Sequence, residues 1–133
     1  MLETIRDGDH ILAIVIRAGY GEPGLHFLTP DDFPFQAGIH NHGKDFVVAP
    51  HAHTPHTDVK ELPVQEIFVI LRGSAEVSVF DRKDQLKKKV KLGQGDIILL
   101  NSGHGATFLG DAKVFEVKQG PYRGRDKEKR MIL

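Results

Sequence analysis

The sequence predicts an all-β domain, a sandwich or barrel of short antiparallel strands. Three observations favour this class: the apolar runs are short, some alternate with polar residues, and turn-forming residues separate most of them. No segment shows the 3.6-residue apolar spacing of an amphipathic helix. Fourteen Gly and seven Pro in 133 residues fit many short elements with frequent turns, and this length indicates one domain.

Eight segments are expected to be strands: 11–16, 46–49, 66–71, 75–80, 90–92, 96–100, 106–109 and 114–117. Within 75–80, Ala75, Val77 and Val79 share one face, which is typical of a half-buried strand. Segment 66–71 is apolar on both faces, which predicts cover on both sides, in a barrel wall or at a subunit interface. The lysine-rich stretch 83–91 is expected to be a solvated hairpin tip rather than an anion-binding patch.

Composition excludes several kinds of function. Eighteen Lys and Arg balance eighteen Asp and Glu, so the net charge indicates neither a nucleic acid nor a membrane as partner. The chain has no Cys, which excludes disulfides, thiolate metal ligands and Cys nucleophiles. The first ten residues lack the apolar core of a signal peptide, and the longest apolar run, 11–16, is too short to span a bilayer. We therefore expect a soluble, cytoplasmic protein.

The most informative feature is a pair of histidines with one residue between them. His51 and His53 follow an apolar stretch that predicts a strand running into a loop, and alternate residues of a strand point the same way. Glu66 lies in an otherwise apolar segment, where a carboxylate needs a cation or strong donors. His104 has a glycine on each side, which predicts a tight turn. Three imidazoles and a carboxylate suit Zn, Mn, Fe or Ni, so these four residues predict a divalent metal site.

Simpler interpretations of the same residues stay open. His51 and His53 are surface loop residues in this alternative, and an Arg pairs with Glu66. His40 and His42 repeat the same-face spacing, but their Asn and Gly neighbours favour a turn over metal ligation.

The motif residues and their order resemble the cupin superfamily. They are His51, His53, Glu66, Gly73, Gly95, Asp96 and His104. This resemblance implies a single-domain, cupin-type double-stranded β-helix, or jelly-roll barrel, with N-terminal strands in 1–45, the motif-bearing barrel in 46–117 and a charged tail in 118–133. It also implies that the three imidazoles and the Glu66 carboxylate are the metal ligands.

The segment 117–122 resembles the tail of small cupins that are described as sugar-isomerase-like and linked with surface-polysaccharide synthesis. This narrower resemblance implies an isomerase or epimerase acting on a sugar or sugar nucleotide as its small-molecule partner. It also implies a homodimer, for which segments 66–71 and 11–16 offer apolar surface.

The chain departs from the cupin pattern between His53 and Glu66, which are separated by the twelve residues 54–65. This insert is polar and contains Pro55 and Pro63, so we expect a mobile flap over the metal-side opening rather than a strand. His56 in the flap is a candidate substrate contact, catalytic base or alternative metal ligand. Tyr122 is a second candidate acid or base, although a Tyr after Gly-Pro is more often packed.

Two other functions are compatible with the same residues. Imidazole and carboxylate ligands with open positions also fit a non-haem Fe(II) oxygenase. Alternatively, the barrel binds a small molecule without catalysis.

Overall fold

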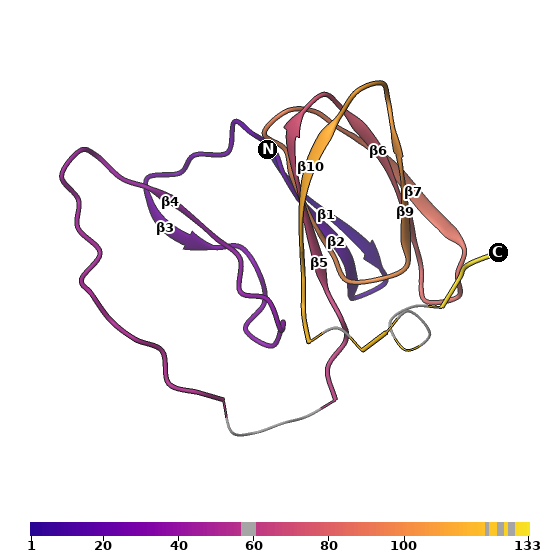
Figure 1. Ribbon diagram of the computed structural model, residues 1–133, viewed down its shortest axis with the longest axis horizontal. Helices are drawn as coiled ribbons and strands as arrows, with labels where there is room; N and C mark the ends of the chain where they lie inside the picture. Colours follow the sequence, from indigo (N-terminus) through magenta and orange to yellow (C-terminus); the bar gives the residue numbers. More distant parts are fainter. Residues whose placement is uncertain (57–60, 122, 125–126, 128–129) are drawn as a thin grey trace. The chain divides into compact units, whose positions relative to one another are not determined.

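The computed structural model describes residues 1–56, 61–121, 123–124, 127 and 130–133, and Figure 1 shows a fold built from β-strands. Among these residues the strands are β1 (Leu2–Asp7), β2 (His10–Ile16), β3 (Gly24–Phe27), β4 (Gly38–Asn41), β5 (Glu66–Arg72), β6 (Ala75–Phe80), β7 (Leu86–Leu92), β8 (Ile97–Leu100), β9 (His104–Phe108) and β10 (Lys113–Lys118). The described part of the chain forms no helix of the length and apolar character needed to cross a bilayer.

The chain forms two compact units, which we describe separately: residues 1–20 with 64–133, and residues 21–63. The larger unit contains two antiparallel sheets, with strand orders β1-β2-β8-β5-β10 and β7-β6-β9 (Figure 1). Both sheets contribute side chains to one apolar core, among them Leu12 of β2, Ile70 of β5, Val77 of β6 and Ile98 of β8. The all-β class predicted from the sequence is therefore confirmed, in a barrel-like arrangement of two sheets.

Burial in β6 follows the predicted alternation. Ala75, Val77 and Val79 are buried while the residues between them are half-buried. In β5, Ile70 is buried, but Leu71 on the other face is exposed within the single chain. Two strands inside this sheet are buried on both faces: β2 from Leu12 to Ile16, between β1 and β8, and β8 from Ile98 to Leu100, between β2 and β5.

Turns connect the strands largely where the sequence predicts them. Only the start of the lysine-rich segment 83–91 is a hairpin tip, where the Asp81 carboxylate accepts hydrogen bonds from the backbone of Lys83 and Gln85. From Leu86 on, the segment belongs to strand β7, which pairs with β6. Gly73, between β5 and β6, has a φ of 76°, and a side chain there would collide with the Asp111 carbonyl oxygen. This glycine is therefore required by the turn itself.

The predicted strand at 46–49 is absent, and these residues are exposed. An apolar run forms a stable strand only where a partner strand completes its backbone hydrogen bonds, and 46–49 has none. The smaller unit instead contains the hairpin β3–β4, in which Leu25 pairs with His40. His40 therefore belongs to a strand, whereas we predicted a turn.

Candidate functional site

Two strands of the larger unit each begin at a predicted metal ligand. Glu66 is the first residue of β5, next to Leu100 on β8, and His104 is the first residue of β9, next to Val79 on β6. The tight turn predicted around His104 is therefore wrong, since Gly105 continues the strand. The two sheets bring the side chains of Glu66 and His104 together although 38 positions separate them in sequence.

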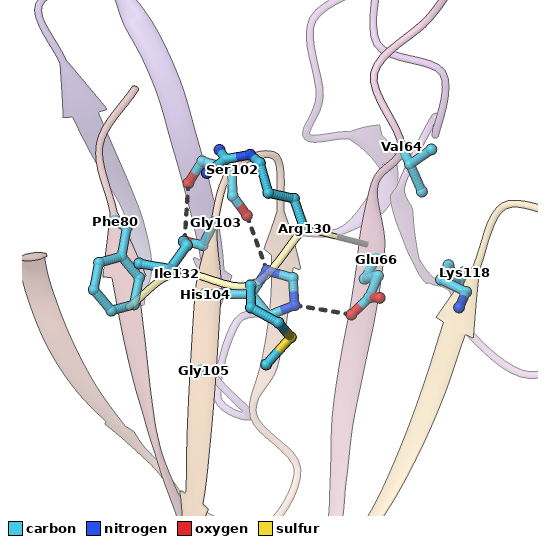
Figure 2. A pocket seen from close by; sticks show the side chains of 11 residues that line it. Val64, Glu66, Phe80, Ser102, Gly103, His104, Gly105, Lys118, Arg130 and Ile132 are labelled. Carbon is cyan, nitrogen blue, oxygen red and sulfur yellow. Dashed lines mark hydrogen bonds and ion pairs between the residues drawn. The ribbon is translucent and has the colours of Figure 1, made fainter. Parts of the chain in front are cut away.

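Both nitrogens of the His104 ring are hydrogen-bonded (Figure 2). Nδ1 lies 2.9 Å from the carbonyl oxygen of Ser102, and Nε2 lies 3.0 Å from Oε2 of Glu66. Because a carbonyl oxygen only accepts hydrogen bonds, Nδ1 must carry a proton and donate it. The Phe68 ring meets the imidazole edge-on at 5.9 Å. The ring is thus fixed in one orientation, with Nε2 directed at the carboxylate.

The charges of this pair stabilise each other. Burial alone would lower the pKa of His104, but the hydrogen bonds to Glu66 and to the Ser102 carbonyl outweigh it and raise that pKa. The hydrogen bond from His104 lowers the pKa of Glu66 against the opposing effect of burial. Glu116 on β10 is a further carboxyl near both groups and adds to the rise in the His104 pKa. The hydrogen bond therefore favours the protonated imidazole and the ionised carboxylate together.

This pair lines a cavity of about 500 Å³, a size typical of small-molecule sites. Most of its walls come from β5, β9, β10 and the loop before β9; the lining residues that Figure 2 labels are Val64, Glu66, Phe80, Ser102, Gly103, His104, Gly105, Lys118, Arg130 and Ile132. Near the C-terminus, Arg130 binds both carboxylate oxygens of Asp84, at 2.6 and 3.1 Å, and Arg130 and Ile132 line one side of the cavity.

The other predicted histidines belong to the smaller unit. The His51 and His53 rings meet edge-on with centroids 5.0 Å apart, and both residues are exposed in a segment without regular structure. Nδ1 of His51 lies 2.8 Å from the Ala49 carbonyl oxygen, so this ring also donates from Nδ1 and presents Nε2 as its lone-pair nitrogen. His56 is exposed, and Tyr122 lies outside the described residues, as do residues 57–60 of the predicted flap.

His40 and His42 interact within their own unit. Nδ1 of His40 lies 3.1 Å from Nε2 of His42, whose ring stacks on Phe46 with centroids 3.7 Å apart.

Sequence reasoning missed several residues at this site. The Ser102 carbonyl, Glu116 and the C-terminal residues reach the cavity or its pair through contacts between distant parts of the chain. Nothing in the sequence pairs Arg130 or Ile132 with the cavity.

No family model, curated protein or solved structure matches this chain. The case for a function therefore depends on the geometry of the site.

Proposed function

We propose that this protein is a small cupin of the jelly-roll type that binds a divalent metal ion and isomerises or epimerises a sugar or sugar nucleotide. Oε2 of Glu66 and Nε2 of His104 would be two of the metal ligands. The cavity beside Glu66 and His104 would receive the substrate.

The hydrogen bond from Nδ1 of His104 to the Ser102 carbonyl is the observation that carries this proposal. It fixes the tautomer in which Nε2 is the nitrogen available to a metal, and such outer bonds usually accompany metal-binding histidines. His51 has the same bond to the carbonyl two residues before it. Without a cation, Nε2 of His104 must hold a proton to satisfy Glu66, so metal and proton compete for one nitrogen.

A divalent ion held here would polarise a carbonyl or a vicinal hydroxyl pair and thereby acidify the adjacent C–H bond. Residues of the protein would orient the ligands and line the cavity. The Ser102 carbonyl and Phe68 hold the His104 ring in place, and Lys118 on β10 lines the side next to Glu66. The base that takes the substrate proton remains one of His56, Tyr122 or a Glu66 released from the metal.

Metal binding is expected to raise the thermal stability of the metal-free protein. A metal at 100 times its dissociation constant adds about 2.7 kcal/mol to the free energy of unfolding. Because the pKa of His104 is raised, protons compete strongly, and the gain should shrink as pH falls through the imidazole range near 6.5. Elemental analysis of protein prepared without added metal, then melting curves with Zn, Mn, Fe(II), Ni or a chelator between pH 5 and 8, measures both effects. A melting temperature that no metal changes would contradict the metal site.

The reaction is tested by proton exchange. Sugar nucleotides incubated with the metal-loaded protein in D₂O should gain deuterium at the carbon next to the carbonyl or the epimerised centre, as read by NMR. Tight Fe(II) binding with O₂ uptake would identify an oxygenase instead. If none of the sugar nucleotides tested gained deuterium and no O₂ were consumed, the result would favour a protein that binds a small molecule without catalysis.

We further propose that the protein forms a homodimer through the outer face of β5 and β10. Phe115 and Val117 on the edge strand β10 pair with Val69 and Ile67 on β5, and Phe115 is 56% exposed. Leu71 extends this apolar surface, whereas β2, the other segment predicted to pair subunits, is already buried within the chain. Replacing Phe115 with Asp should produce monomers in analytical ultracentrifugation, and Lys87→Asp on exposed β7 should not. A wild-type monomer at micromolar concentration would contradict the dimer.

A further inference from the structure

A polar network around the buried side chain of Gln65, with the half-buried Asn101 and Gln119, lies beside the cavity. Gln65 is fully buried, and its backbone N–H donates to Oε1 of Gln119 at 2.6 Å. Its side-chain Nε2 donates to Oδ1 of Asn101 at 2.9 Å. Asn101 in turn donates from Nδ2 to the Ile11 carbonyl and from its backbone N–H to the Leu12 carbonyl, at 2.9 and 2.8 Å. The network therefore joins the chain at the ends of β2, β5, β8 and β10.

Each side chain of the network is the sequence neighbour of a residue that lines the cavity. Gln65 precedes Glu66, Asn101 precedes Ser102, and Gln119 follows Lys118. A shift of the backbone at any of the three would move a cavity residue directly. We expect the largest effect from Asn101, because the carbonyl oxygen of the next residue, Ser102, accepts the hydrogen bond that orients His104.

A polar network is a costly way to fill a buried position. Buried amides must satisfy every donor and acceptor, and an apolar side chain of similar size would pack there without that requirement. What hydrogen bonds add is a fixed register between segments, since they tolerate only a narrow range of distance and angle. Here the segments held in register are the ones that carry Glu66 and His104.

We propose that Gln65, Asn101 and Gln119 are positioning residues that set the spacing between Glu66 Oε2 and His104 Nε2. The role in metal binding rests on the proposed function. The effect on the Glu66–His104 hydrogen bond does not, because that bond joins the two side chains directly.

The test compares Gln65→Met with a matched core variant. Methionine keeps the length of the side chain and removes the donor to Asn101. Val77→Ala, in the fully buried centre of β6, truncates the core at a position that does not line the cavity. In metal-free protein at pH 6, NMR of the His104 Nε2 proton should show a weakened bond to Glu66 in Gln65→Met and an unchanged bond in Val77→Ala. Gln119→Met, which removes the acceptor for the Gln65 N–H, is the second variant if the first does not fold.

Titration with Co²⁺ gives an independent reading. Loss of an outer hydrogen bond to a metal site commonly lowers affinity about 10–100-fold, and we expect this range for Gln65→Met together with a changed visible Co²⁺ spectrum. Unchanged His104 signals and Co²⁺ affinity in a folded Gln65→Met would overturn the positioning role. If wild-type protein binds no Co²⁺ while the His104 bond still weakens, the proposed metal site fails and the positioning role stands.

Discussion

Replacing Asp96 with Ala is expected to lower the free energy of unfolding by about 3 kcal/mol. Asp96 lies between β7 and β8, and its carboxylate accepts hydrogen bonds from the backbone N–H groups of Gly93 and Ala18, at 2.8 and 3.0 Å, and from Arg17 at 3.0 Å. Alanine leaves all three donors without this partner. The Arg17 side chain is 35% exposed, so water screens part of its contribution, and we expect the low end of the range for broken buried pairs.

The Asp96 carboxylate also makes part of the free energy of unfolding dependent on pH. Burial would raise the pKa of Asp96, but the bonds from Gly93, Ala18 and Arg17 outweigh it and lower that pKa. The stabilisation is therefore complete above the unfolded pKa of about 3.9 and is lost as pH falls through the lower folded value. Urea unfolding at pH 7 and pH 3 should show a difference between wild type and Asp96→Ala that shrinks in acid. Asp111→Ala, in an exposed turn, is the control and should change stability by less than about 0.5 kcal/mol.

The fold class was predictable because most strands bury one side and obey a two-residue period. Ala75, Val77 and Val79 show this directly. Strand β1 has a weaker pattern, with only Ile5 buried, and becomes a strand by pairing with β2, which sequence reasoning did not identify. The exposed run 46–49 shows the converse: apolar character without a partner strand gives no strand.

Part of the motif that suggested a metal site has a structural explanation. Gly73 is needed for the β5–β6 turn, and Asp96 caps the β7–β8 turn, where Gly95 has a φ of 85° and would place a side chain against Ala18. Of the four residues that the sequence predicted to converge, Glu66 and His104 do approach each other in the structure.

The polar network beside the Glu66–His104 pair could not be predicted from the sequence. Gln65 and Gln119 are 54 positions apart, and Gln65 and Asn101 are 36 apart. A single Gln or Asn in the sequence gives no sign of which distant side chain it will meet. Only the strand order of the folded sheet, β8-β5-β10, brings the three segments together.

Replacing His104 with Ala is expected to have the largest effect on metal binding. Loss of an outer hydrogen bond costs about 10–100-fold in affinity, so loss of a ligand nitrogen should exceed that range. Glu66→Gln, which keeps the shape and one acceptor but removes the charge, should weaken binding as well. His10→Ala is the matched control, since it changes the same residue type in the same unit at a position that does not line the cavity. Calorimetric titration with Zn²⁺ or Mn²⁺ at pH 7.5 would measure the four proteins side by side.

The metal-free variants add a pH signature that a surface histidine would lack. The raised pKa of His104 gives stability that is complete below the unfolded value of about 6.5 and is lost as pH rises through the folded value. The lowered pKa of Glu66 gives stability that is present above about 4.3 and is lost as pH falls through its folded value. His104→Ala should therefore cost most stability between about pH 4.3 and 6.5, and less above it, where metal affinity rises as the proton leaves Nε2. If His104→Ala and His10→Ala gave the same metal affinity and the same flat pH profile, the Glu66–His104 pair would not be the functional centre.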